Sequence, residues 1–370
     1  MSDEAVAKVV DGRAWLEFCE LLRKAGDVIA REDLGTTPFD RAEGLRYLSR
    51  LLAAGFSSFV EATGPAHPVF RPLPELVKMG LDNPDNYYVS ASIDPRRDYR
   101  IRGTRGTIHY LSFAAQNQNF AARDRITGGA GHLNDSELAL EADGSFEIVA
   151  SQREHPGNWL RLAPDTKQIL VRQTFLERAR ERPVELAIEC VGVAGPPPAL
   201  DPARVGGQLL GSAMYAIGCA QWFADWVVGF RTRAPVNAFH LPSEDDHRRL
   251  GGDPNIRLWL GTWRLGPEEA LVIEAAPPKC PYWNFQLGNI WAESLDSRFQ
   301  RVHINSGQAA YRGDGSFELV VAHRDSGHPN WISTAGHEHG TMGLRWVLAD
   351  SHPEPRTRVV KVGDLLPRSR

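Results

Sequence analysis

Two histidines separated by one residue, His337 and His339, lie in the glycine-flanked stretch AGHEHG. On a β-strand alternate side chains share a face, so both imidazoles would point the same way. Imidazole is a common ligand of zinc and other divalent cations, and His323 would supply a third ring nitrogen from earlier in the chain. We predict no cofactor, but these three histidines leave a divalent metal site open as an alternative.

The same histidines can act as proton donors and acceptors without a metal. Imidazole titrates near neutral pH, and an acidic partner fixes which ring nitrogen carries the proton. We therefore predict the catalytic residues of an acid–base site among His337, His339, Asp325, Glu338 and His323. The alternative is that they are polar loop residues that hydrogen-bond the backbone.

Residues suited to holding a substrate surround this set. Arg345 precedes Trp346 on an expected strand, where a buried guanidinium can bind a carboxylate or a carbonyl oxygen. Asparagine amides can hydrogen-bond a ligand, although asparagine is also a common turn residue. Aromatic side chains suit an apolar or ring-containing molecule. The candidate substrate-binding residues are Arg345, Asn330, Asn305, Tyr282, Trp283 and Trp331.

The composition of the chain excludes several classes of function. Its formal net charge of −4 over 370 residues gives no bulk attraction to nucleic acid or to an anionic membrane. No phosphate-binding loop, Rossmann glycine motif, serine-hydrolase elbow or HExxH motif occurs.

Four cysteines lie far apart without CxxC spacing, which favours a reducing compartment. The N-terminus has no signal-peptide pattern, so we expect a cytoplasmic protein.

Three segments have the pattern of helices. Residues 12–30 place apolar side chains on one stripe at helical spacing. A second helix is expected to start at Thr37 and Pro38, an N-cap residue followed by the favoured first helical residue, and to end at Gly55. Residues 201–232 are glycine-rich and largely apolar, but their polar residues leave an apolar run too short for a bilayer. We therefore expect a buried helix there and no membrane span.

Two strand-rich regions of the chain align with each other. HYLSFAAQN in the first corresponds to PYWNFQLGN in the second, and DGSFEIV corresponds to DGSFELV at a similar offset. Asn158 then matches Asn330, and Arg172 matches Arg345. Ordered matches of this length indicate a duplication. Residues present in both copies are best explained by folding, whereas the histidines and acids found only in the second copy have no such obligation.

The duplication and the turn signals predict an α+β fold. Asp-Gly pairs at Asp143 and Asp314 are strong hairpin signals. Two similar antiparallel β-units, each with an apolar face, would form sandwiches of jelly-roll type with helices packed against them. We expect an N-terminal helical segment at 1–61, a first β-unit at 62–193, a long buried central helix at 201–232, and a second β-unit at 254–370 that carries the site.

The second strand region resembles a known family. The stretches YWNFQLGNIW, HIN, YRGDGSFELVVAHRD, PNW and GTMGLRW, within residues 281–346, are similar to the bacterial domain-of-unknown-function family 1214. NPDNYY and YRIRG resemble the companion segment of longer relatives. The resemblance implies a β-sandwich of jelly-roll type, often preceded by helices and another β-unit. It implies no common activity, although relatives occur among catabolic functions for hydrophobic compounds.

We expect an enzyme that acts on a hydrophobic small molecule, such as a terpenoid, steroid or aromatic compound. It would use acid–base chemistry of the lyase, isomerase or hydrolase type in an aromatic-lined pocket of the second β-unit. The alternatives are a non-catalytic binding protein for an apolar ligand or a sugar, and a metal-dependent enzyme that uses His337 and His339. A homodimer is also open, because the glycine-rich central helix could bury itself in an interface.

Overall fold

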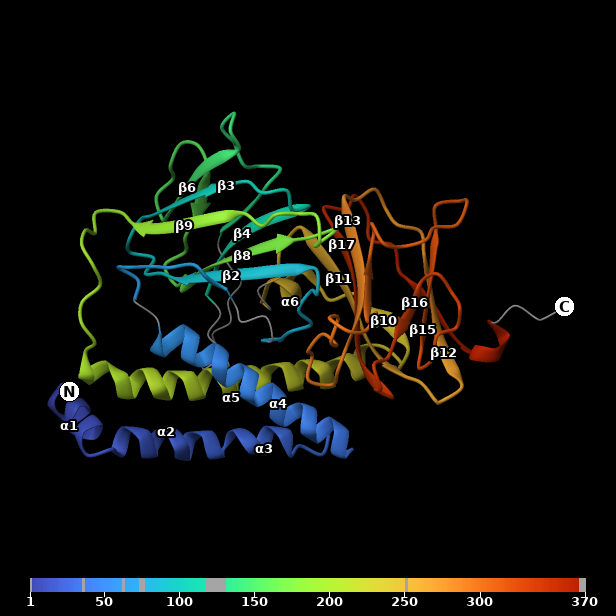
Figure 1. Ribbon diagram of the computed structural model, residues 1–370, viewed down its shortest axis with the longest axis horizontal. Helices are drawn as coiled ribbons and strands as arrows, with labels where there is room; N and C mark the ends of the chain where they lie inside the picture. Colours follow the sequence, from blue (N-terminus) through green and yellow to red (C-terminus); the bar gives the residue numbers. More distant parts are fainter. Residues whose placement is uncertain are drawn as a thin grey trace.

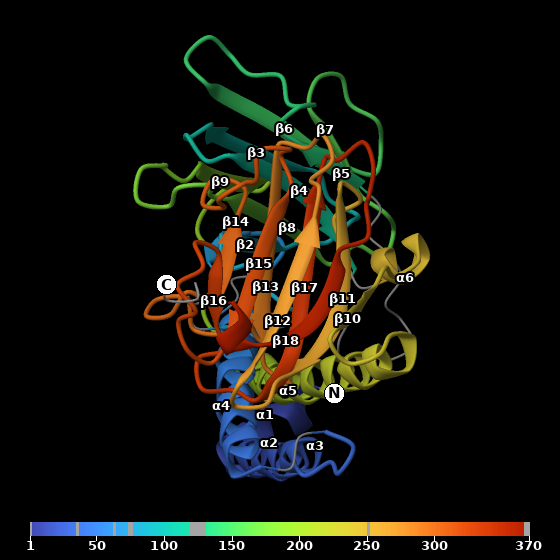
Figure 2. The same cartoon turned by 90° about the vertical axis from the view of Figure 1, so that its right-hand side faces the viewer.

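The computed structural model describes residues 2–34, 37–61, 64–72, 77–117, 131–249 and 252–365. The bounds Ala62 and Arg370 that we expected for the two β-units therefore lie outside the described residues. Two β-units lie side by side, with helices along one side (Figure 1), and the second unit faces the viewer in Figure 2. The predicted α+β fold with duplicated sandwich-like units is confirmed.

The N-terminal helices are shorter and more numerous than predicted. The stretch expected as one helix at 12–30 is broken at Lys24, whose backbone N–H bonds Leu21 O in a tighter turn, and a weak helix former, Gly26, follows. A helix that we did not predict precedes it. The three helices are α1 (Ser2–Val10), α2 (Arg13–Arg23) and α3 (Ala25–Ile29).

Helix α4 (Pro38–Gly55) begins where the sequence predicts. Asp40 N–H donates to the Thr37 hydroxyl at 3.1 Å, and Thr37 N–H donates to the Asp40 carboxylate at 3.3 Å. This reciprocal capping box satisfies two backbone donors at the start of the helix. It also fixes the direction in which the first turn of α4 points its acidic side chains.

Helix α5 (Pro202–Arg233) is the predicted long central helix. Asp201 caps it by accepting from Ala203 N–H at 3.0 Å. With 32 residues it extends for about 48 Å, beneath both β-units (Figure 1). Its small residues Ala216 and Ala220 are buried in a core shared with Tyr47 of α4. Among the described residues, no helix is both long and apolar enough to cross a lipid bilayer.

The first β-unit consists of two sheets packed around one apolar core. The larger sheet has the order β1-β2-β8-β4-β5 and the smaller one the order β7-β6-β3-β9. Its strands are β1 (Arg71–Pro72), β2 (Asn86–Ser92), β3 (Tyr99–Thr104), β4 (Tyr110–Gln116), β5 (Gly131–Asn134), β6 (Ser145–Ser151), β7 (Trp159–Arg161), β8 (Gln168–Thr174) and β9 (Glu185–Cys190).

The second β-unit repeats this arrangement strand for strand. Its sheets have the orders β10-β11-β17-β13-β14 and β16-β15-β12-β18, so each described strand of the first unit corresponds to the strand nine places later. Its elements are β10 (Ala238–His240), the short helix α6 (Glu244–Arg249), β11 (Ile256–Arg264), β12 (Glu269–Ala275), β13 (Tyr282–Gly288), β14 (His303–Asn305), β15 (Phe317–Ala322), β16 (Trp331–Ser333), β17 (His339–Val347) and β18 (Arg356–Lys361).

Equivalent side chains hold equivalent turns in the two units. Asn330 accepts from Ala310 N–H and donates to Ala310 O and Glu318 O, at 2.7 to 2.8 Å. Asn158 makes the same three bonds to Ala139 and Glu147 in the first unit. The asparagines common to both copies therefore serve folding, as the repeat predicted.

At their junction, each β-unit has a buried aspartate that contacts side chains of the other unit. Asp85, in the loop before β2, accepts from the Tyr282 hydroxyl at 2.7 Å and lies 3.1 Å from His303 Nε2. In the opposite direction Asp253, before β11, lies 2.9 Å from His132 Nε2 and 3.2 Å from the Tyr110 hydroxyl. These reciprocal contacts fix the two sheets against each other.

Candidate functional site

His337 lies in the loop between β16 and β17 and reaches into the helical layer. Its Nε2 is 2.7 Å from Glu43 Oε2 on α4, and its Nδ1 is 3.1 Å from the carbonyl oxygen of Thr334. The imidazole therefore bridges the Thr334 carbonyl and the Glu43 carboxylate. His337 and Glu43 are both buried, so this contact lies inside the protein.

His339, at the start of β17, contacts another acidic residue of α4, one helical turn before Glu43. Its Nε2 lies 3.3 Å from the carboxylate of Asp40, which forms the capping box of α4 with Thr37. Phe39 packs edge-on against the His337 ring, with ring centroids 4.9 Å apart. The first two turns of α4 thus supply a separate partner for each histidine.

One amide joins Glu43 to a second buried carboxylate. Asn289 Nδ2 donates to Glu43 at 3.1 Å and to Glu293 at 2.8 Å. Arg46 binds the other oxygen of Glu43 at 2.9 Å, and Arg50 binds Glu293 at 2.5 Å. Glu43 and Glu293, which are far apart in the chain, are therefore both hydrogen-bonded to the side chain of Asn289.

The surroundings move the pKa values of these two acids in opposite directions. Burial alone would raise the pKa of Glu43, but the hydrogen bond and charge of His337, with help from Asn289 and Arg46, lower it overall. Burial raises the pKa of Glu293, and the opposing effect of Arg50 does not cancel it. Opposite shifts in adjacent acids are the arrangement that assigns one as base and the other as acid.

These acids line a pocket of about 440 Å³ between α4 and the second β-unit. Three cationic side chains, Arg46, Arg50 and Lys78, share its wall. Lys78 donates to the carbonyl oxygens of Ser294 and Leu295, both at 2.9 Å, and burial lowers its pKa. The pocket is therefore lined by charged groups of both signs, with Phe39 and Phe299 as its aromatic residues.

The structure does not bring the other predicted catalytic residues to this pocket. Asp325 is exposed and caps the turn at Gly327, and Glu338 is also exposed. His323 bonds the Thr334 hydroxyl at 2.9 Å and Leu265 O at 3.2 Å. His323, His337 and His339 thus have separate partners, and no group of three potential metal ligands occurs among the described residues.

The predicted polar anchors bind the protein itself. Arg345 is buried and donates to Gln286 at 2.5 Å and to Leu81 O. Asn305 Nδ2 donates to Leu176 O at 3.1 Å. With Asn330 in its turn, these three residues hold neighbouring segments and do not line either described pocket.

The predicted aromatic wall is part of the core. Trp283 stacks on Phe317 between the sheets of the second unit, with ring centroids 4.1 Å apart. Trp331 donates its indole N–H to Ala322 O at 3.1 Å, and the Tyr282 hydroxyl donates to Asp85. Their packing gives no support to an aromatic-lined pocket.

Three residues of the site, Glu43, Asn289 and Glu293, were not among our predictions. Glu43 is followed three residues later by Arg46, the pattern of an exposed helix pair, so nothing marked it as buried. Asn289 and Glu293 follow the stretch YWNFQLG. The sequence signal for them is that they are polar residues within a mostly apolar run.

The fold and the candidate site define a class of duplicated β-sandwich protein. In this class an N-terminal helix contributes an acidic residue to a pocket on the second unit. The chain belongs to the family described as "Protein of unknown function (DUF1214)", whose profile matches residues 89–174 and 269–350, one match in each β-unit. No curated protein matches the chain.

Similar chains occur among solved structures. The chain is similar to a putative uncharacterized protein from Burkholderia cenocepacia, with 40% sequence identity and a TM-score of 0.93 over 97% of this chain and 99% of that one. A protein from Vibrio parahaemolyticus, VPA0106, is 13% identical with a TM-score of 0.49, over 85% of this chain and 96% of that one.

Proposed function

We propose that the protein is an acid–base enzyme of the isomerase or lyase type, and that it acts in the pocket between α4 and the second β-unit. The observation that carries the proposal is the pair Glu43 and Glu293, bridged by Asn289, with pKa values shifted in opposite directions. The reaction class follows from what such a pair does best, which is to remove one proton and supply another.

In the proposed step the ionised Glu43 removes a proton from a substrate carbon. The protonated Glu293 donates its proton to a second substrate atom, so one C–H bond breaks and a new bond to hydrogen forms. The substrate is isomerised, and the two carboxyl groups have exchanged protonation states. Proton exchange with solvent then restores the resting enzyme.

His337 is a positioning residue in this scheme. Its Nε2–H bond to Glu43 keeps that carboxylate ionised and oriented, while the Thr334 carbonyl fixes the imidazole. His339 acts one step further away, because it binds Asp40 of the capping box and so supports the first turn of α4.

The lining of the pocket supports a small carboxylate as the substrate. Arg46, Arg50 and Lys78 lie on the wall, where a guanidinium or an ammonium group can bind a substrate carboxylate. Phe39 and Phe299 offer a limited apolar surface. We therefore propose a smaller and more polar substrate than the terpenoid, steroid or aromatic compound expected from the tryptophans.

A covalent nucleophile is less well supported. Ser294 is the hydroxyl residue of the pocket lining, and its hydroxyl donates to Asp82 at 2.7 Å without contacting an imidazole. Nucleophilic serine needs an adjacent general base. The hydrolase form of our expectation is thus the weaker one.

Proton removal can be tested before the substrate is known. The purified protein is incubated in D₂O with 2-oxobutanoate, 4-methyl-2-oxopentanoate, phenylpyruvate and but-3-enoate, and proton NMR follows the loss of C–H signals. Exchange above the buffer rate is expected for at least one acid, and not for its methyl ester. Glu43→Gln and Glu293→Gln should each slow it by about 10² to 10⁴-fold.

The matched control is Glu338→Gln, which changes an exposed acid next to His337 and should leave the exchange rate unchanged. Exchange that survives Glu43→Gln would contradict the assigned base. No exchange with any of the acids would contradict the enzyme proposal, and binding without exchange would favour the non-catalytic alternative.

A further inference from the structure

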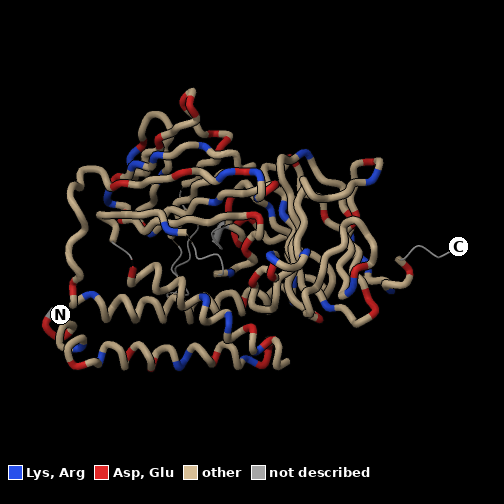
Figure 3. The backbone as a smooth tube through the Cα atoms, viewed as in Figure 1, with Lys and Arg blue, Asp and Glu red and all other residues tan. Residues whose placement is uncertain are grey.

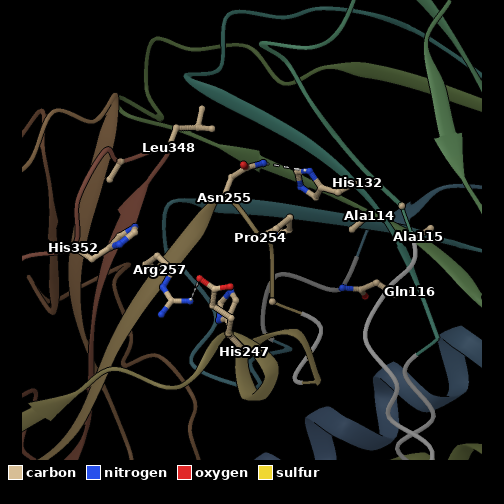
Figure 4. Close-up of a pocket in the computed structure, with 14 residues that line it drawn as sticks. Ala114, Ala115, Gln116, His132, His247, Pro254, Asn255, Arg257, Leu348 and His352 are labelled. Atoms are coloured by element: carbon tan, nitrogen blue, oxygen red, sulfur yellow. Dashed lines mark hydrogen bonds and ion pairs between the residues drawn. The ribbon is translucent and has the colours of Figure 1, made fainter.

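A second cavity, of about 590 Å³, lies at the junction of the two β-units. Its size is within the range of about 300–1,000 Å³ typical of small-molecule sites. Ala114 and Gln116 on β4 form one side, and Arg257 on β11 with His247 on α6 forms the opposite side (Figure 4). It is separate from the pocket of Glu43, because none of the described residues lines both.

The two units differ at the position of Ala114, which lines the cavity. Ala114 pairs with Leu170 and His132, and Gln286 holds the same register position against Gly343 and His303 in the second unit. The Gln286 side chain is fully buried and donates to Asp82 O at 2.8 Å. Ala114, at the equivalent position of the first unit, leaves empty the volume that the Gln286 side chain fills in the second.

A second small residue enlarges the cavity in the same way. Thr174 and Val347 occupy equivalent register positions beside Tyr110 and Tyr282, so Ala349 is the counterpart of Leu176, two residues further on. The Leu176 side chain packs closely over Gly307. Ala349 lines the cavity and fills less of it.

A rigid polar wall closes one end of the cavity. His132 Nε2 lies 2.9 Å from the Asp253 carboxylate, and Asn255 Nδ2 lies 3.3 Å from His132 Nδ1. Asp253 and Asn255 therefore contact opposite nitrogens of the same ring. Asp253 also accepts from the hydroxyls of Tyr110 and Ser112, which fixes the wall before any ligand arrives.

Arg257 is the cationic residue of the lining. Its acid partner Glu244 is 3.8 Å away with a side chain that is 80% exposed, so that ion pair is weak. The Arg257 side chain is only 15% exposed, and it donates to Pro242 O at 3.2 Å. Burial, together with the charge of Arg257, lowers the pKa of His247 and His352. Arg257 therefore gives this side of the cavity a positive charge.

We propose that the cavity is a second binding site, for the carboxylate of a small molecule with an apolar body. The carboxylate binds the Arg257 guanidinium, whose planar donors match it. The apolar body lies over Ala114, Pro254 and Leu348, which line the space between the polar groups. The proposal does not depend on chemistry at Glu43.

Calorimetric titration of the full-length protein tests the site. The probes are benzoate, 2-naphthoate and 9-anthracenecarboxylate, with 2-naphthamide and inorganic phosphate as controls. At least one ring carboxylate should bind tenfold or more tightly than the amide and the phosphate. Arg257→Gln should weaken binding about tenfold or more, because a charge-assisted bond is lost. Arg264→Gln, an exposed residue of the same strand, should not.

Ala114→Gln adds the side chain that the second unit carries at this position and should abolish binding while the protein stays folded. If this variant does not fold, Ala349→Leu makes the same test with the counterpart of Leu176. Glu43→Gln should leave carboxylate binding here unchanged, which separates the two sites. Carboxylates that bind no better than the amide, or equal binding by Arg257→Gln, would overturn the proposal.

Discussion

His337 and Glu43 are 294 positions apart in the chain and 2.7 Å apart in the structure. Their contact joins the loop before β17 to helix α4, so the N-terminal helices complete a site whose other acid, Glu293, belongs to the second β-unit. The position of α4 on that unit therefore controls the geometry of the proposed proton transfer. Charged residues of both signs are spread over the helices and both units (Figure 3), and this site is a local arrangement within them.

The docking of α4 can be tested at Gly44, next to Glu43. A Cβ there would lie 2.7 Å from the Trp291 ring, so Gly44→Ala should lower the free energy of unfolding by about 1–3 kcal/mol. Gly207→Ala, on α5, meets no atom within 4 Å and should raise it by up to about 1 kcal/mol. Urea unfolding measures both, and equal effects would contradict the close approach of α4.

The two equivalent asparagines should differ in their contribution to stability. Asn330→Ala removes three hydrogen bonds at a buried position, and we expect a loss of about 2–3 kcal/mol. Asn158→Ala removes the same three bonds at a more exposed position, where water replaces them, and should cost about 1 kcal/mol or less. Thermal unfolding of both variants compares them, and a larger loss for Asn158→Ala would contradict this account.

The buried acid at the junction should stabilise the fold at neutral pH. Burial alone would raise the pKa of Asp253, but the hydrogen bond and charge of His132, with the charge of Arg172, hold it well below its ordinary value of 3.8. A carboxyl with a lower pKa in the folded state adds stability above the unfolded pKa and loses it as the pH falls.

Asp253→Asn should therefore cost about 3 kcal/mol at pH 7, and the deficit should shrink below pH 4. Asp325→Asn is the matched control, because Asp325 is exposed, and its effect should stay within about 0.5 kcal/mol. Urea unfolding between pH 3 and pH 8 measures both. A deficit for Asp253→Asn that is independent of pH would show that its charge is not responsible.

Glu293 should show the opposite dependence on pH. Its pKa is raised by burial, so the folded protein loses stability as the pH rises through the unfolded value of about 4.5. The stability of Glu293→Gln relative to the wild type should therefore increase from pH 4 to pH 8. The same urea series measures it, and a decrease over this range would contradict a raised pKa.

Much of the fold could be predicted from local patterns. Thr37 and Pro38 mark the start of α4, Asp201 marks the start of α5, and the repeated DGSFE turns reveal the two β-units. These signals work because caps and hairpins depend on neighbouring residues alone. The break at Lys24 was missed, since the apolar stripe continues across it.

The site was predictable only in part. The sequence predicts His337 as a site residue because its neighbour His339 and the flanking glycines set it apart from the first copy, and its role stays a prediction. Its partner Glu43 was not predicted, because the burial of a helix glutamate depends on which unit packs over it. The number of tryptophans in the second unit predicts an aromatic pocket wall, whereas Trp283 and Trp346 lie in the core of that unit.

The most direct test of the proposed site is the titration of Glu43 and Glu293. Carbon-13 NMR of protein labelled at the glutamate carboxyl groups, assigned with Glu43→Gln and Glu293→Gln, gives the two pKa values without knowledge of the substrate. We expect Glu43 to titrate below the ordinary value of 4.5 and Glu293 above it. Two ordinary values, or the reverse order, would contradict their roles as base and acid.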